Sequence, residues 1–567
     1  MLTDFGESYV KEIENARTAK KSLTSLSSDS NTKTKESNII KPNNQLLHLL
    51  RSLLDIGDLD HGLFILNHLP RWSCTSYREI NTLLTKILAY IVDPLYKANS
   101  DLHSTFRQYE LENPVSNRQL KTVETWNDFR EETLPLLLHL GAFCQDRLLF
   151  MKLTRLCTHF MKKLSTNNDQ QQQEDILLLI DEVLLPSLSL LDVNCCLAIE
   201  LWSLIKQFPY DIRYGLYQQW YDETYRKTSQ LIFIKQDVTD KTRAILRRIT
   251  KDNLKTYSRQ IAKMTHNNPT VILSVIIDQV QRFDNFILVI NDALKYLSPL
   301  AYDIVCYTIL HALTAPVSNA LLPNYIDGKM SRETATPSQW FQNLCVLTAN
   351  VLRKYPIDFT AILNYIYDQL RLETTCDLYL LRQIITTMSG VEVTSAVTTE
   401  QLEAAAGGEL LRSEAAQFTA ARNVKKPSIR LKEALLDNNL YLPLSIIIAQ
   451  QRSCIVFKFG EQRIEHLKLI GSLYDQCQDT MVQFFTYLSN VLTTENFHHQ
   501  FPSIDDLVLG FHLQVDAAFQ ISRPLFNLNI QVDRKLRKIT TTIVYFSRQN
   551  SMNFEQQFLN QARKLHW

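Results

Sequence analysis

Residues 200–263 read ELWSLIKQFPYDIRYGLYQQWYDETYRKTSQLIFIKQDVTDKTRAILRRITKDNLKTYSRQIAK. The first half of this stretch is rich in aromatic residues, and Tyr210, Tyr214, Tyr217 and Tyr221 fall at helical spacing. The second half is basic. An aromatic segment that runs directly into a positively charged one predicts helices that present an interaction surface.

The basic half contains the residues that we predict to contact a partner or RNA: Arg243, Arg247, Arg248, Lys251, Lys255, Arg259 and Lys263. Several of them are four residues apart, which looks like one stripe. However, each step of four turns the chain by about 400°, so such a stripe would wander around a straight helix. Asp252 and Asn253 also predict a break and a new N-cap. We therefore expect two clusters on two successive helices: Arg243, Arg247, Arg248 and Lys251 on the first, and Lys255, Arg259 and Lys263 on the second.

The basic half and the aromatic half of residues 200–263 can each be structural or can each bind a partner. Helix faces exposed to solvent often carry such cations, while an acidic partner or an RNA backbone would also need them. The aromatic residues between Trp202 and Tyr225 fit the core between helix pairs better than a surface that stacks on bases. The alternating basic and aromatic strand pattern of RNA-recognition domains is absent.

Glycine is scarce along the whole chain, with 12 in 567 residues, about 2% where roughly 7% is usual. Tight turns and nucleotide-binding loops need glycine, so the chain is expected to be helices joined by short loops. Apolar-periodic segments recur about every 20 residues, which gives helix pairs near the HEAT period of about 40. The predicted fold is all-α, an elongated α-solenoid of HEAT-like helix pairs.

We divide the chain into four parts. Residues 1–44 are polar and predict a disordered leader. Residues 45–230 and 231–526 predict two helical segments, and 527–567 form a divergent tail of unknown structure. Within the first segment, Gly57–Asp60 is expected to be a turn between two helices, and Asn167 to Gln173 a low-complexity loop.

The signatures of enzymes are missing from the sequence. It contains no GxxxxGK[ST] or GxGxxG motif, and Gly407-Gly408 precedes an acid, which would repel phosphate. Cys195-Cys196, His498-His499 and His466 with Cys477 lack metal-ligand spacing. Residues 466 and 477 also lie about 16 Å apart along one predicted helix, too far to act together. We predict no enzyme activity, no cofactor and no metal.

Composition also limits the location of the protein. The net charge of +1 provides no overall attraction to nucleic acid or membrane. The longest apolar segment, Ile176–Leu191, is interrupted by Asp181 and Glu182 and contains Pro186, so no membrane span is predicted. The ten cysteines have no disulfide-framework spacing and indicate reduced cysteines in a nuclear or cytosolic protein.

Several long, collinear segments resemble the THO complex subunit 2 family, the largest subunit of the nuclear THO complex. Those that carry the resemblance include LLDIGDLDHGLFILNHLP (53–70), ELWSLIKQFPYDIRYGLYQQWYDETY (200–225), ILRRITKDNLKTYSRQIAKMTHNNPTVI (245–272), RLKEALLDNNLYLPLSIIIAQQR (430–452) and HLKLIGSLYDQCQDTMVQF (466–484). The resemblance covers about residues 45–526. The ends diverge from the family or are truncated.

The resemblance implies a nuclear, non-enzymatic scaffold of the transcription–export assembly. Such a scaffold would join the other THO subunits and a DEAD-box RNA helicase, and so couple transcription to mRNA packaging and nuclear export. It would contact mRNA indirectly and no membrane. The alternative is a helical-repeat protein that binds RNA directly through the basic cluster 243–263.

Overall fold

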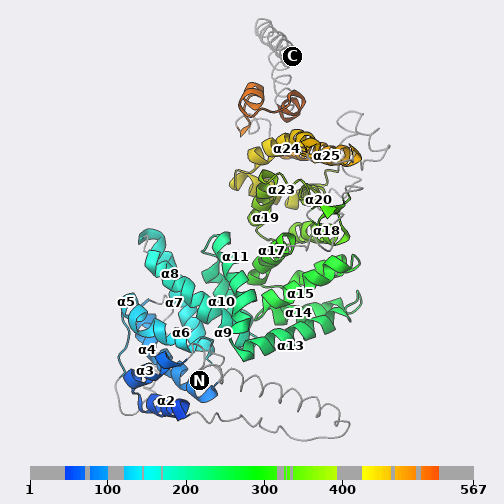
Figure 1. Cartoon of the computed structure of the whole chain (residues 1–567). Coiled ribbons are helices and arrows are strands. Elements are labelled where there is room, and N and C mark those ends of the chain that lie inside the picture. The colour runs from blue at the N-terminus through cyan, green and yellow to red at the C-terminus, as the bar shows by residue number, and fades with distance from the viewer. Residues whose placement is uncertain are drawn as a thin grey trace, which may run out of the picture. The chain divides into compact units, whose positions relative to one another are not determined.

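The computed structural model describes residues 45–69, 77–99, 120–142, 146–167, 170–315, 325–326, 328–331, 336–392, 424–461, 467–492 and 500–522. Apart from one small hairpin, its regular elements are helices (Figure 1). The hairpin pairs β1 (Tyr325–Ile326) with β2 (Met330–Ser331) in antiparallel register. The chain divides into two compact units, Met1–Ser52 and Leu53–Trp567, and helix α2 (Gln45–Ile56) spans the division.

The first group of helices runs to the end of the aromatic segment, and three of its helices continue through a π-helical turn. They are α3 (Leu59–His68), α4 (Arg78–Asn99), α5 (Trp126–Asp128), η3 (Phe129–Thr133), α6 (Leu134–Leu140), α7 (Arg147–Asn167), α8 (Gln170–Leu179), η4 (Ile180–Leu184), α9 (Leu185–Leu190), α10 (Cys195–Ile205), α11 (Tyr210–Gln219), η5 (Trp220–Thr224) and α12 (Tyr225–Lys227).

The remaining helices begin with the basic segment. They are α13 (Ser229–Leu246), α14 (Leu254–Thr265), α15 (Pro269–Arg282), α16 (Phe286–Ala293), η6 (Leu294–Tyr296), α17 (Pro299–Thr314), α18 (Gln339–Lys354), α19 (Thr360–Arg371), α20 (Leu378–Ser389), α23 (Lys425–Asp437), α24 (Tyr441–Glu461), α25 (Leu467–Val491) and η9 (Asp506–Gly510).

Local sequence signals explain many of these boundaries. Proline occupies the first helical position of α15 and α17, where its missing N–H is not needed. Side chains of Asn194, Thr228 and Ser298 accept hydrogen bonds from backbone N–H groups in the first turn of α10, α13 and α17. Gly390 ends α20 in the left-handed conformation, with φ +73°, which costs a glycine little.

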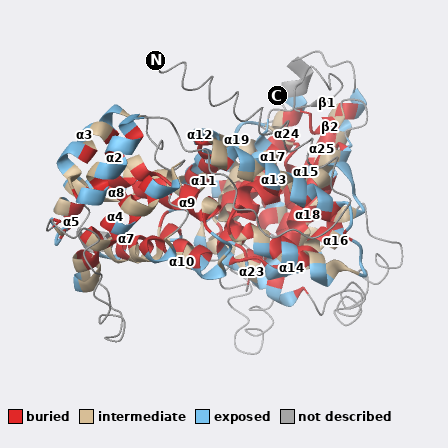
Figure 2. Cartoon of the chain, turned by 90° about the horizontal axis from the view of Figure 1, so that it is seen from below, coloured by how far each residue is buried: buried red, intermediate tan, exposed pale blue. Residues whose placement is uncertain are grey.

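Within the larger unit, each helix packs against near neighbours in the sequence. Helix α13 contacts α15, α15 contacts α17 and α18, α18 contacts α20, and α20 and α24 both contact α25. Buried residues form a continuous interior between these helices, while exposed residues lie on the outer faces (Figure 2). This succession of packed helices confirms the predicted all-α, helical-repeat class.

The predicted loop from Asn167 to Gln173 is wrong for all of its described residues, since Asn167 ends α7, and Asn168 and Asp169 lie outside the described residues. Gln170 to Gln173 form the first turn of α8 instead of a loop. Glutamine has a high helix propensity, and the apolar residues that follow hold the helix, with Ile176 and Leu179 buried. A run of one residue type therefore does not indicate a loop here.

Three further predictions concern the turn after α2, the division of the chain at residue 230, and the two ends. The predicted turn Gly57–Asp60 is confirmed at Gly57, with φ +84°, and at Asp58, which caps α3, whereas Leu59 and Asp60 already belong to that helix. The division at residue 230 falls in the first turn of α13, which packs on α9 and α12, and it stays a prediction. The leader 1–44 and the tail 527–567 lie outside the described residues.

Candidate functional site

The predicted break in the basic segment is confirmed, but the placement of Arg247, Arg248 and Lys251 on the first helix is wrong, because these residues lie in the turn between the two helices. Helix α13 ends at Leu246 and α14 begins at Leu254. In the turn between them, the Asn253 side chain accepts a hydrogen bond from the Thr250 N–H at 2.7 Å and donates one to the Arg248 carbonyl at 2.9 Å. Asn253 therefore closes the turn that precedes it and makes no side-chain cap on α14.

All of the predicted contact residues lie at the surface. Arg243, Arg247, Arg248, Lys251, Lys255, Arg259 and Lys263 are exposed. None of these cations forms an ion pair with a described residue, whereas the neighbouring Lys241 pairs with Asp237 at 2.6 Å. The opposite faces of both helices are buried through residues such as Ile245 and Ile261. The charged groups of the seven residues are consequently open to solvent.

The two clusters have different surroundings. Arg243 on α13 faces Asp278 of α15: burial raises the pKa of that carboxyl, and the positive charges of Arg282 and Arg243 oppose this rise. On α14 the guanidinium of Arg259 lies 5.9 Å from the ring centroid of Tyr296 in η6, and Lys295 lies at the same distance from that ring. The structure thus adds Lys295 and Tyr296 to the second cluster.

The expectation that the aromatic residues form core is confirmed for part of the set, since Trp202, Tyr210, Tyr214 and Tyr221 are only half-buried. Tyr217, Trp220 and Tyr225 are completely buried. The indole N–H of Trp220 donates to Ser189 Oγ at 3.0 Å, and the Tyr225 hydroxyl donates to Asn268 Oδ1 at 2.8 Å. These contacts join η5 to α9 and α12 to the start of α15, and the three buried rings cannot stack on bases.

A buried ion pair that the sequence did not indicate links α11 to α17. Arg213 Nη2 donates to Asp303 Oδ1 at 3.0 Å, and the Tyr217 hydroxyl donates to Asp303 Oδ2 at 2.8 Å. Burial raises the pKa of Asp303, and Arg213 and Tyr217 oppose that rise. Each oxygen of the carboxylate has a partner, so this group holds helices together and offers no reactive site.

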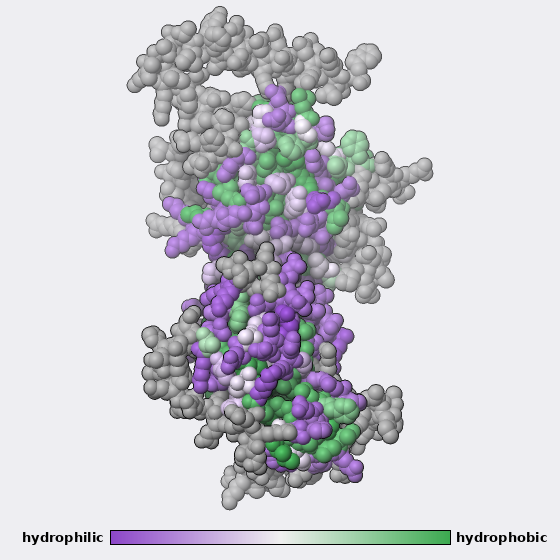
Figure 3. All heavy atoms as spheres, turned by 90° about the vertical axis from the view of Figure 1, so that its left-hand side faces the viewer, coloured by the Kyte–Doolittle hydropathy of each residue, from purple (hydrophilic) through white to green (hydrophobic). Residues whose placement is uncertain are grey.

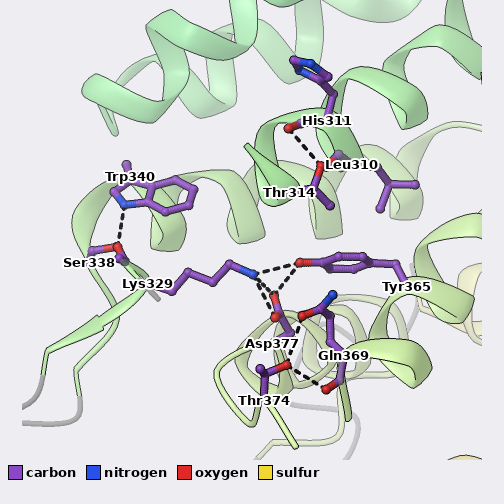
Figure 4. Close-up of polar contacts among 11 residues, drawn as sticks. Leu310, His311, Thr314, Lys329, Ser338, Trp340, Tyr365, Gln369, Thr374 and Asp377 are labelled. Carbon is purple, nitrogen blue, oxygen red and sulfur yellow. Dashed lines mark hydrogen bonds and ion pairs between the residues drawn. The ribbon is translucent and has the colours of Figure 1, made fainter. Parts of the chain in front are cut away.

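A second buried pair anchors the hairpin. Lys329 Nζ donates to both oxygens of Asp377 at 2.9 Å and to the Tyr365 hydroxyl at 2.8 Å (Figure 4). The Trp340 indole also donates to the Gly328 carbonyl at 3.1 Å. A lysine whose three protons all have acceptors, beside a fully paired carboxylate, is a structural link between the hairpin, α19 and α20.

Among the described residues, the structure shows no metal site and no reactive cysteine at the positions examined in the sequence. The described residues contain no group of three or more His, Cys, Asp or Glu side chains able to hold a metal. Burial raises the pKa of the Cys477 thiol to about 12, which leaves it protonated and unreactive. The sites His466, His498-His499 and Gly407-Gly408 lie outside the described residues.

The helices of the described residues are too short or too polar to cross a membrane singly. Two successive helices reach the length and apolar composition of a membrane span only when they are taken together, Lys425–Asp437 and Tyr441–Phe457. They are bent by 89° relative to each other. Helix α24 of this pair packs against α19 and α25.

Comparison with known proteins identifies the family. The model of the THO complex subunit 2 N-terminus matches residues 2–125 and 116–259, and that of the transcription- and export-related complex subunit matches 261–345. THO complex subunit 2 of Homo sapiens is 39% identical over 494 residues, which are 86% of this chain and 30% of the relative. THO complex subunit 2 of Arabidopsis thaliana is 28% identical over 519 residues, or 86% of this chain and 27% of the relative.

The chain spans about a third of the length of the curated relatives that it matches. The matched regions include the basic and aromatic segment and the helices on both sides of it. On this evidence the chain belongs to the THO complex subunit 2 family.

Proposed function

We propose that the protein is a non-enzymatic scaffold subunit of the nuclear THO/transcription-export complex. In this role it joins other THO subunits and a DEAD-box RNA helicase, and it couples transcription to mRNA packaging and export. The observation that carries the proposal is the 39% identity to human THO complex subunit 2 over 86% of this chain.

The surface supports a role in binding other proteins. Large apolar side chains stand exposed at separate places on the larger unit, among them Phe64 (65%), Leu148 (71%), Leu288 (64%) and Phe457 (71%). On the face shown in Figure 3, apolar patches alternate with hydrophilic areas. Exposed apolar patches rimmed by polar residues are typical of protein–protein contact sites.

Affinity purification of the tagged chain from nuclear extract, followed by quantitative mass spectrometry, tests the scaffold function. We expect other THO subunits and a DEAD-box helicase to be enriched both before and after nuclease treatment, because a scaffold binds proteins directly. Loss of both on nuclease treatment would show that RNA bridges them, and recovery of neither would contradict the proposal.

A second function, direct RNA binding through α13 and α14, is favoured by one observation. The seven predicted cations on α13, on α14 and in the turn between them are exposed and have no ion-pair partner among the described residues. Each contact to a phosphate of single-stranded RNA contributes about 0.7 to the slope of log affinity against log salt. The triple change Arg247→Gln, Arg248→Gln and Lys251→Gln should therefore lower that slope by up to about 2. An unchanged slope would exclude this cluster.

A further inference from the structure

An exposed aromatic ring with cations beside it lies at the edge of the second basic cluster. Tyr296 in η6 is 39% exposed. The charged groups of Arg259, from α14, and of Lys295 each lie 5.9 Å from its ring centroid. Helix packing thus brings together an aromatic surface and two positive charges from separate elements.

Hydrogen bonds from two tyrosines hold the backbone beside this ring. The Tyr302 hydroxyl of α17 donates to the Leu294 carbonyl at 2.9 Å, and the Tyr355 hydroxyl donates to the Asn291 carbonyl at 2.5 Å. Leu294 itself is buried. The turn that carries Tyr296 is therefore held from below, and its ring needs no large rearrangement before it meets a ligand.

The charges around the ring favour an anionic ligand. Helix α14 has no acidic residue, and Lys255 and Lys263 lie one helical turn to either side of Arg259. Asp292 of α16 is already paired with Lys354 at 2.5 Å. Helices α14 and α16 also carry exposed residues on the outside of the protein in Figure 2. The unbalanced charge at this surface is positive.

We propose that Arg259, Lys295 and Tyr296 form a contact point for a nucleotide of single-stranded RNA. The two cations bind its phosphate, and the tyrosine ring stacks on its base. Binding exchanges weak contacts between cation and ring for a charged hydrogen bond and a stacking contact. An acidic peptide would use the cations but would have no group that requires the ring. The proposal rests on the second function above, direct RNA binding.

The test measures binding of a fluorescent oligouridylate to the full chain by anisotropy. Tyr296→Ala should weaken binding about 5- to 150-fold, the usual range for losing one stacked base, with the salt slope unchanged. Tyr296→Phe should retain affinity, because the ring remains. Arg259→Gln with Lys295→Gln should instead lower the salt slope by about 0.7, because the two cations bind one phosphate.

Tyr367→Ala is a matched control, since Tyr367 on α19 has a single cation, Arg371, 5.8 Å from its ring and should not affect binding. If the wild-type chain binds no RNA, the second function itself fails. If it binds RNA and Tyr296→Ala binds equally well, only the contact point at Tyr296 is overturned. Equal affinity for polyglutamate, insensitive to Tyr296→Ala, would overturn it in favour of an acidic partner.

Discussion

Arg213 and Asp303, 90 residues apart in the sequence, form a buried ion pair of 3.0 Å between α11 and α17. Both side chains are at most 10% exposed. Through Arg213 on α11, the pair is part of the aromatic segment that leads into the basic helices. It fixes the aromatic helix to the helix that also supports Tyr296 through Tyr302.

Asp303→Ala should destabilise the protein by about 3–5 kcal/mol, because it leaves the Arg213 charge buried without its partner. The double change Arg213→Met and Asp303→Leu removes both charges and should restore most of that loss. Thermal unfolding followed by tryptophan fluorescence provides the comparison. A double variant as unstable as Asp303→Ala would show that packing, and not the unpaired charge, is decisive.

The pair also shows where sequence reasoning stops. Helical periodicity and helix ends are local properties, so α11, α13 and the break before Leu254 could be predicted from neighbouring residues. The partners of Arg213 and Arg259 come from distant helices, and only the packing of α11 on α17 and of α14 on η6 brings them close. Tyr296 and Lys295 had no local signal that separated them from other surface residues.

Asp181 in η4 provides a pH-dependent prediction. Burial raises the pKa of its carboxyl from 3.8 to about 6. The folded state therefore binds the proton of the Asp181 carboxyl more tightly than the unfolded state does. The contribution of Asp181 to the free energy of unfolding is thus largest below pH 3.8 and is lost as the pH rises to about 6. Above that pH the contribution stays constant.

Asp181→Asn should consequently be more stable than the wild type above pH 6. The expected gain is about 1–2 kcal/mol, because a pKa difference of one corresponds to about 1.4 kcal/mol and solvent screening reduces the effect for a partly exposed group. Melting temperatures from pH 4 to 8 would show the difference growing up to pH 6. The control Glu182→Gln breaks the 2.8 Å ion pair with Lys227 and should not stabilise.

The basic cluster should be irrelevant to stability. Lys255, Arg259 and Lys263 are exposed and have no ion-pair partner among the described residues, so changing all three to glutamine should alter the free energy of unfolding by less than about 0.5 kcal/mol per residue. Calorimetric unfolding of the triple variant measures this. A large decrease in melting temperature would mean that the charges hold the fold, which would weaken the case for binding.

Unlike the exposed cations of the basic cluster, Lys329 should contribute strongly to stability. Its side chain is 9% exposed and pairs with Asp377, which is 1% exposed. Lys329→Met should destabilise the protein by about 3–5 kcal/mol, since the buried Asp377 carboxylate loses the positive charge of Lys329. Tyr365→Phe removes one hydrogen bond to each of these groups and should cost only about 1–3 kcal/mol.

Because the pair joins the hairpin to α19 and α20, far from α13 and α14 in the sequence, the Lys329→Met variant should keep its affinity for RNA at temperatures where it is folded. Hydrogen exchange would show faster exchange at Met330 and Ser331 with α14 unaffected. Equal acceleration in α14 would indicate that the two regions unfold as one cooperative unit. In that case the basic surface would depend on the buried pairs, and the RNA-binding variants would have to be compared at matched stability.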